Sequence, residues 1–298
     1  MDRRTFLQAA GALGAGLVFG STDAAAASPP FRMKYAPHFD QFRRLGGKDP
    51  LDQIRFMHDE GFRALEDNGM RNRPVELQEQ IGKELDRLGM TMGVFVITAN
   101  FGAPDFATND PAAMEPVLAA VRDSLEVAKR VNAQWCTVVP GRVNPALDWD
   151  TQTKLVIDNL KRCAEICEQT GLIMVLEPLN GRDHPEMFLT KIPQAYEICK
   201  AVGSSSCKIL DDFYHQQITE GDLIPKLDAA WDEIAYIQVG DNPGRKEPTT
   251  GQHKYKNIFK HLHAKGYTGV IGMEHGRAGS GEAGERAVIE AYRTCDSF

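Results

Sequence analysis

The sequence predicts an α/β protein of the (β/α)8 TIM barrel type. Three observations support this fold: short apolar runs alternate with longer amphipathic stretches, the alternation repeats eight times, and glycines stand where most of the predicted helices end. Of the 298 residues, those from 28 onward have the size of one barrel domain. An open doubly wound sheet is the main alternative, but no GxGxxG run follows the first predicted strand.

The predicted strands are short runs of β-branched and other apolar residues. They cover Met33–Ala36, Ala64–Glu66, Thr91–Ile97, Trp135–Val139, Leu172–Glu177, Cys207–Asp212, Ile234–Val239 and Gly269–Glu274. The predicted helices are the amphipathic stretches between them. They cover Pro50–Glu60, Pro74–Leu88, Ala112–Val131, Trp149–Thr170, Ile192–Val202, Glu220–Ala230, Tyr255–Lys265 and Glu282–Tyr292. Glycines that favour a helix end follow five of these helices: Gly61, Gly89, Gly171, Gly203 and Gly266.

Residues 1–27 are predicted to be a twin-arginine (Tat) export signal and not part of the fold. Arg3 and Arg4 precede an apolar stretch rich in glycine and alanine that reaches Gly20, and Ala24–Ala27 offer small residues for cleavage. This stretch is too short to span a bilayer comfortably, so we expect no stable membrane anchor. The sequence therefore predicts a periplasmic protein whose single barrel domain spans residues 28–298.

The composition excludes several classes of partner. The formal net charge is −7, and removing the predicted signal leaves it unchanged because two acidic and two basic residues are lost together. An acidic chain without Lys/Arg clusters argues against nucleic acid and anionic membranes. Six cysteines in a chain of this length do not indicate a disulfide scaffold. Cys136 and Cys207 are interpreted as buried strand residues, whereas a pairing of Cys163 with Cys167 is left open.

Four predicted strands deliver a polar side chain with oxygen atoms at their C-terminal ends: Glu177, Asp212, Gln238 and Glu274. Side chains alternate along a strand, so the neighbours that share a face with these four should point inward. Those neighbours are Ile173, Val175, Leu210, Ile234, Tyr236, Val270 and Gly272. The four polar residues are thus predicted to converge on one divalent cation, and an all-oxygen set suits Mg²⁺ or Mn²⁺. Any single one of them could instead cap the helix that follows.

Motifs in the loops after these strands resemble a known family. They are EPLN from Glu177, DxYHxQ from Asp212, QxxDNPGRxEP from Gln238 and a final ME at Glu274. Together they resemble the hydroxypyruvate isomerase branch of the xylose isomerase-like TIM barrels, a sugar isomerase/epimerase family related to the tagatose and psicose 3-epimerases. The resemblance covers residues 135–274 and is weaker in the N-terminal third.

The resemblance implies a role for individual residues. It implies that the divalent metal is held by Glu177, Asp212, Gln238 and Glu274, where Gln238 stands in place of an epimerase histidine. Glu177 and Glu274 match the pair that also moves protons. The positions that match substrate contacts are His215, Arg245 and Asp183. The chain departs from the family in the stretch Glu247–His253, where the branch usually reads EPGTGE, and at Tyr236, where a histidine is common.

These residues predict an isomerase that interconverts a small 2-hydroxy-carbonyl pair through a cis-enediolate, such as hydroxypyruvate and tartronate semialdehyde. A guanidinium such as Arg245 favours a keto acid over a neutral keto sugar. The alternatives are a periplasmic 3-epimerase or lyase with the same metal site, and a non-catalytic sugar-binding barrel. A barrel nuclease would need a basic groove and more histidines than the chain offers. The sequence leaves the oligomeric state open, a homo-oligomer included.

Overall fold

The apolar runs of the sequence form parallel strands in residues 28–298, the part of the chain that this computed structural model describes. Seven strands make one sheet in the order β1, β9, β8, β7, β6, β5, β4, and β2 pairs with β3. The strands are β1 Lys34–Ala36, β2 Ala64–Leu65, β3 Thr91–Met92, β4 Val96–Ala99, β5 Trp135–Val139, β6 Ile173–Leu176, β7 Cys207–Asp212, β8 Ile234–Gln238 and β9 Val270–Gly272.

Backbone hydrogen bonds join the two sheets into a ring. The amide of Glu66, just after β2, donates to Pro37 O, just after β1, over 3.0 Å. The predicted strand Thr91–Ile97 is interrupted at Gly93 and forms two short strands, β3 and β4. These two strands follow each other directly along the chain and together occupy one strand position of the barrel. Counted this way, eight strand positions close the barrel, and the predicted (β/α)8 fold is confirmed.

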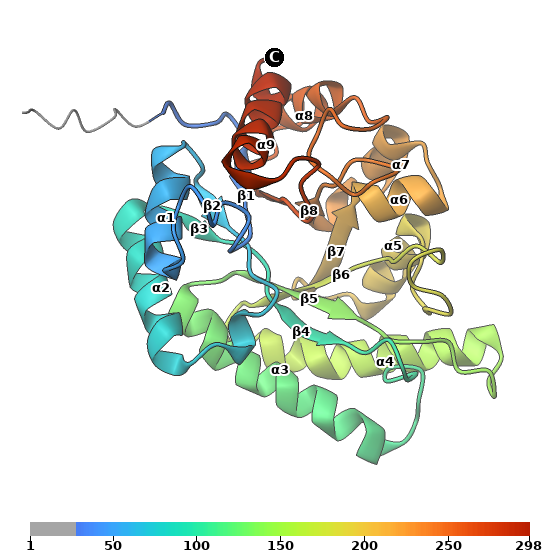
Figure 1. Cartoon of the computed structure of the whole chain (residues 1–298). Helices are drawn as coiled ribbons and strands as arrows, with labels where there is room; N and C mark the ends of the chain where they lie inside the picture. Colours follow the sequence, from blue (N-terminus) through green and yellow to red (C-terminus); the bar gives the residue numbers. More distant parts are fainter. Residues whose placement is uncertain (1–27) are drawn as a thin grey trace, which may run out of the picture.

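The helices lie around the outside of the strands (Figure 1). They are α1 Pro50–Asp59, α2 Val75–Leu88, α3 Pro111–Val131, α4 Trp149–Cys167, α5 Ile192–Val202, α6 Phe213–Thr219, α7 Leu223–Ala229, α8 Tyr255–Ala264 and α9 Gly281–Asp296, with 3-10 turns at Met70–Asn72 and Trp231–Glu233. Carboxylates of Asp49, Asp110 and Asp148 accept backbone N–H groups where α1, α3 and α4 begin.

One helix differs from the sequence-based prediction. The predicted helix Glu220–Ala230 is shorter in the structure and corresponds to α7. Gly221 and Asp222 have positive φ angles of 64° and 53°, so the chain is not helical at these two residues and α7 begins after them. Before them, α6 forms directly after β7, where the sequence predicted only a loop. Its short length hides the helical period from a sequence reading.

A small apolar cluster fills the barrel interior below its C-terminal end. It contains Ala36, Ala64, Val94, Val175, Leu210, Tyr236 and Val270, with Ile173 packed against it. Five of the neighbours expected to face inward belong to this cluster or pack against it: Ile173, Val175, Leu210, Tyr236 and Val270. The expectation was wrong for Ile234, which packs against the larger outer cluster, whereas Ala235 packs against the inner one. A separate, larger cluster packs the helices against the outside of the strands. The inward direction of the four polar residues therefore follows from the strand period.

All six cysteines are free and buried, so the Cys163–Cys167 pairing that the sequence left open is not formed. Burial of Cys136 and Cys207 in strands is confirmed. Within residues 28–298, no helix has both the length and the apolar character needed to cross a membrane. The predicted export signal falls on residues 1–27, which lie outside the described residues.

Candidate active site

Polar side chains from four adjacent strands meet at the C-terminal end of the barrel. Asp212 and Gln238 are the last residues of β7 and β8 and are register partners. Gln238 is also paired with Gly272 of β9, two residues before Glu274, and Glu177 directly follows β6. The fold thus brings together the ends of the strands that carry the four predicted metal ligands.

Two basic side chains show that the three carboxylates converge. Nη2 of Arg245 lies 3.0 Å from Asp212 Oδ2 and 2.7 Å from Glu274 Oε2. Nε2 of His215 lies 3.6 Å from both Glu177 Oε1 and Asp212 Oδ2. Ligand atoms of Glu177, Asp212 and His215 are all within 4.8 Å of one another. The closely spaced carboxylates of this group can hold a small cation, and the hydrogen bonds of His215 decide whether its ring nitrogen takes part.

Asp212 uses its two oxygens for different purposes. Oδ1 accepts the backbone N–H of Tyr214 over 2.8 Å and caps α6, while Oδ2 faces Arg245. The capping role that the sequence left as an alternative is therefore real. It leaves one oxygen for the site.

Gln238 supplies the strongest indication that the site fits a cation. Its Nε2 donates to Glu66 Oε1 over 2.6 Å. Its Oε1 is buried and accepts no hydrogen bond from residues 28–298. An unsatisfied buried acceptor costs about 1–3 kcal/mol, and a bound cation would remove this cost. The donor set of carboxylate and amide oxygens fits a hard divalent ion such as Mg²⁺ or Mn²⁺.

His215 is a hydrogen-bond donor to the site and not a metal ligand. Its Nδ1 receives the backbone N–H of Asn180 over 3.2 Å and Asn180 Nδ2 over 2.6 Å. The Asn180 amide is fixed in this orientation because its Oδ1 accepts the backbone N–H groups of Arg182 and Asp183. Two donors at Nδ1 place the proton of the neutral ring on Nε2. That N–H faces Glu177 and Asp212 and has no lone pair for a metal.

Burial and charge set the ionisation of the site. Burial, then the charges of Glu274 and Asp212, raise the pKa of Glu177 well above its ordinary value. Burial also raises the pKa of Asp212, although Arg245 opposes this. For His215, burial and then Arg245 lower the pKa to about 3, which keeps the ring neutral.

Arg245 is the permanent positive charge among these acids. Burial opposes its charge, but Asp212 and Glu274 outweigh this effect and raise the pKa of Arg245 further. Its guanidinium carbon lies 4.8 Å from the centre of the Tyr214 ring. Nε and Nη2 donate to Glu274 and Asp212, whereas Nη1 donates to no atom of residues 28–298. Nη1 is therefore the edge that can bind a substrate anion.

The loop after β8 is folded around a buried carboxylate, and this fold places Arg245. Asp241 accepts the backbone N–H groups of Asn242, Gly251 and His253 over 2.9, 2.8 and 3.0 Å. A Cβ at Gly251 would overlap the Asn242 carbonyl, so this turn requires glycine. The DNPGR motif of the sequence thus combines a loop-forming aspartate with the arginine that the loop carries.

Asp183, predicted to contact substrate, has its hydrogen bonds within its own neighbourhood. Tyr214 OH donates to Asp183 Oδ2 over 2.7 Å, and Asn180 Nδ2 reaches the same oxygen over 3.2 Å. Burial opposes ionisation, but the hydrogen bonds from Tyr214, Asn180 and Arg182 outweigh it and lower the pKa of Asp183 to about 2. The carboxylate holds the β6 and β7 loops together, and a substrate contact stays a prediction.

A cavity of about 230 Å³ opens beside the carboxylates. Its lining contains polar residues, which include Glu177, His215, Arg245 and Glu274, and apolar residues, which include Val96, Ala99, Val139 and Leu179. Phe101, which is half exposed, stacks on His184 with ring centroids 5.0 Å apart. Because the volume is below the range usual for drug-sized ligands, the cavity favours a small substrate.

Two cavity residues escaped the sequence analysis. Thr137 Oγ1 and Asn68 Oδ1 are buried, line the cavity and have no hydrogen-bond partner in residues 28–298. Asn68 Nδ2 donates to Glu274 Oε1 over 2.9 Å. No motif marks either residue, and the only signal for Thr137 is its inward position in an otherwise apolar strand. Both atoms can accept hydrogen bonds from substrate hydroxyl groups.

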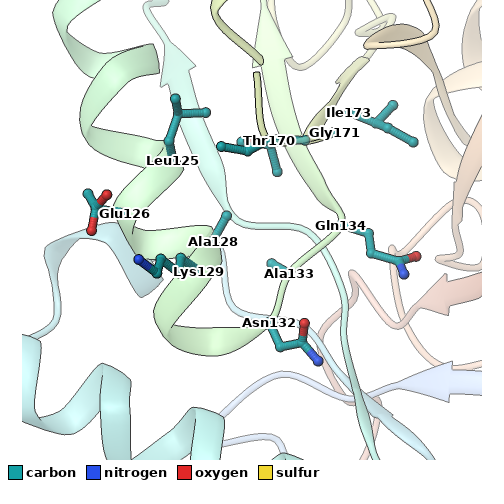
Figure 2. A pocket seen from close by; sticks show the side chains of 11 residues that line it. Leu125, Glu126, Ala128, Lys129, Asn132, Ala133, Gln134, Thr170, Gly171 and Ile173 are labelled. Atoms are coloured by element: carbon teal, nitrogen blue, oxygen red, sulfur yellow. The ribbon is translucent and has the colours of Figure 1, made fainter. Parts of the chain in front are cut away.

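A larger groove of about 530 Å³ lies at the opposite end of the strands (Figure 2). It is lined by the end of α3, including Glu126 and Lys129, and by the segment from Thr170 to Ile173 at the start of β6. None of the predicted site residues lines it. In a (β/α)8 barrel this N-terminal face serves stability, so the small cavity is the candidate active site.

Comparisons with known proteins agree with the architecture. A family model described as a xylose isomerase-like TIM barrel matches residues 54–295. The 2-oxo-tetronate isomerase of Cupriavidus necator is 29% identical over 232 residues, which cover 76% of this chain and 86% of that protein. The hydroxypyruvate isomerase of Escherichia coli strain K12 is 28% identical over 200 residues, which cover 65% of this chain and 77% of that protein.

Solved structures show the same fold. The apo form of 3-keto-D-glucoside 4-epimerase from E. coli superimposes with a TM-score of 0.73 at 20% sequence identity. The superposition covers 90% of this chain and all of that one. At this level of identity the likeness concerns the fold alone.

In chelator-treated protein, Glu177→Gln is expected to raise the free energy of unfolding at neutral pH. The folded pKa of Glu177 is raised above its unfolded value of about 4.3, so the carboxyl destabilises the native state as pH rises from that value through the folded pKa. The gap between variant and wild type should be small near pH 4 and grow by up to about 1.4 kcal/mol per pH unit. Urea unfolding across this pH range measures it.

The exposed Glu126→Gln provides the matched control, because it changes the same chemical group far from the site. Its stability gap should stay flat with pH. A flat gap for Glu177→Gln as well would contradict the raised pKa.

Proposed function

The chain belongs to the xylose isomerase-like TIM barrel family, and we propose that it is a divalent-metal-dependent isomerase of small 2-hydroxy-carbonyl compounds, with a keto acid such as hydroxypyruvate as substrate. The observation that carries this proposal is the cluster of Glu177, Asp212 and Glu274 around His215 and Arg245. Gln238, the register partner of Asp212, adds a buried Oε1 that has no hydrogen-bond partner in residues 28–298. The names of the two isomerase relatives support the reaction class.

Glu177, Asp212, Gln238 and Glu274 would hold the metal in this proposal. When bound, Mg²⁺ or Mn²⁺ supplies a Lewis acid that polarises the substrate carbonyl and stabilises the negative charge that develops on its oxygen. The apolar cavity residues Val139 and Leu179 would limit the access of water to the reacting carbons of a bound substrate.

The proton steps belong to the two glutamates. Glu177 is buried, and His215 Nε2 at 3.6 Å is too far to donate a hydrogen bond to it. This carboxylate is therefore available to take a proton from a substrate carbon. Glu274 is held by Asn68 and Arg245 and would return a proton to the neighbouring carbon. Transfer between adjacent carbons is isomerisation, whereas return to the other face of the same carbon is epimerisation.

His215 and Arg245 would orient the substrate. The Nε2–H of His215 points between Glu177 and Asp212 and can donate to a substrate hydroxyl or carbonyl oxygen. The open Nη1 edge of Arg245 can donate to a substrate carboxylate. A keto acid satisfies both donors, which is why we favour it over a neutral keto sugar. Export to the periplasm stays a sequence-based prediction.

The proposal predicts metal-dependent hydrogen exchange next to the carbonyl. Chelator-treated protein should be inactive, and Mn²⁺ or Mg²⁺ should restore conversion of hydroxypyruvate in heavy water, with deuterium entering the product carbon that gains hydrogen. Proton NMR measures both. Glu177→Gln and Glu274→Gln should each lower kcat by about 10²–10⁴-fold, the usual contribution of a positioned acid or base.

Glu126→Gln serves as the control for this experiment and should leave kcat unchanged. If the product is the epimer of the substrate and not its isomer, the protein is an epimerase, which is the alternative function. If reloaded protein exchanges no hydrogen with any keto acid or keto sugar, the catalytic proposal fails.

The keto-acid preference predicts a charge-dependent effect at Arg245. Arg245→Ala should lower kcat/KM for hydroxypyruvate at least about 30-fold more than for a neutral keto sugar, which corresponds to about 2 kcal/mol for a lost buried charge pair. Arg245→Lys should recover only part of the loss because it lacks the planar fork. The neighbouring cation Lys246, changed to alanine, should affect both substrates alike. Equal losses on the acid and the sugar for Arg245→Ala would remove the preference.

A further inference from the structure

A carboxylate that belongs to no predicted role lies next to the proposed metal ligands. Glu66 follows β2 and is fully buried, with 0% of its surface exposed. Three donors surround it: His38 Nε2 at 2.8 Å from Oε1, Gln238 Nε2 at 2.6 Å from Oε1, and Tyr236 OH at 2.6 Å from Oε2. Such a group is stable as an acceptor only because these partners satisfy it.

Two glycines make room for this carboxylate and for Tyr236. A Cβ at Gly272, the last residue of β9, would overlap Glu66 Oε2 and approach Gln238 Cγ. A Cβ at Gly93, between β3 and β4, would overlap the hydroxyl of Tyr236. The space for Glu66 and its partner thus depends on two positions without side chains, in separate parts of the barrel. This is a built arrangement and not a chance contact on the surface.

The hydrogen bonds of Glu66 fix the orientation of the Gln238 amide. Oε2 of Glu66 accepts the hydroxyl of Tyr236, and Oε1 lies 2.8 Å from His38 Nε2 and accepts the NH₂ group of Gln238, which therefore faces Glu66. The amide oxygen then points in a different direction, and it is this atom that is buried without a partner. A flipped amide would present its NH₂ to the cation and its oxygen to Glu66, and both contacts would be repulsive.

Glu66 therefore has a task that the proposed function does not contain. We propose that Glu66 is a positioning residue that turns Gln238 Oε1 toward the divalent metal, with Tyr236 and His38 holding the carboxylate in place. The inference rests on the proposed function, because it concerns the same metal site. It makes the oxygen ligand at position 238 a joint property of β2 and β8.

The test is metal binding by the chelator-treated full chain, measured by titration calorimetry with Mn²⁺. Glu66→Gln introduces an amide that no longer requires NH₂ from Gln238, and it should weaken Mn²⁺ binding about 10–100-fold, as loss of a ligand-orienting partner does. Glu126→Gln is the matched control. It makes the same chemical change at an exposed position far from the site, so it should leave the affinity for Mn²⁺ unchanged.

A reciprocal exchange separates orientation from packing. In the double variant Glu66→Gln with Gln238→Glu, the NH₂ of residue 66 donates to the new carboxylate, which still offers an oxygen to the metal. The double variant should regain most of the affinity lost in Glu66→Gln. If Glu66 only fills space, Glu66→Gln should bind Mn²⁺ like wild type, which overturns the inference.

The wild-type protein decides the matter where the variants do not fold. With ¹³C- and ¹⁵N-labelled glutamine, Mg²⁺ should shift the side-chain carbonyl carbon of Gln238 while its NH₂ remains hydrogen-bonded. If Mg²⁺ does not shift the carbonyl signal of Gln238, the inference about Glu66 fails, while the proposed function is not affected. Wild-type protein that binds neither Mn²⁺ nor Mg²⁺ overturns the proposed function together with it.

Discussion

The structure depends on holding three carboxylates close together at the mouth of a buried barrel. Glu177, Asp212 and Glu274 repel one another, and burial strengthens that repulsion because little water remains to screen it. Arg245 offsets part of it through its contacts with Asp212 and Glu274. Glu177 makes no ion pair with Arg245 in the described residues, and burial, followed by the charges of Glu274 and Asp212, raises its pKa even though Arg245 opposes this. A site of this composition gains most from a second positive charge, which is the physical reason it favours a divalent cation.

The surrounding polar groups hold the charged groups of the site in place. Asp212 divides its oxygens between a helix cap and the site. The backbone N–H and the side-chain amide of Asn180 both donate to one nitrogen of His215, which leaves the other nitrogen protonated and facing the acids. Asp241 gathers three backbone amides and so fixes the loop that carries Arg245. These contacts keep the charges of the site in place before a substrate arrives, so little reorganisation is needed during the reaction.

Sequence periodicity predicted the barrel and the convergence of strand ends, because both follow from local alternation. It did not predict α6, which is too short to show a helical period. It also missed Thr137 and Asn68, since a single polar residue carries no spacing. Glu66 was visible only as an acid at the end of a strand. Its partners lie 28, 170 and 172 residues away, and no local pattern reports contacts across such separations.

The identity of the ligand at position 238 illustrates how far such contacts reach. The resemblance implies a histidine ligand at this position in the related epimerases, and the tautomer of a histidine determines which ring nitrogen can bind the metal. An amide has no such tautomers, so a neighbouring group must orient its oxygen toward the metal. Glu66 provides that orientation, Tyr236 completes the hydrogen bonding of Glu66, and Gly93 and Gly272 leave the space for both. In this chain the glutamine at position 238 therefore depends on a buried acceptor and on two glycines as well.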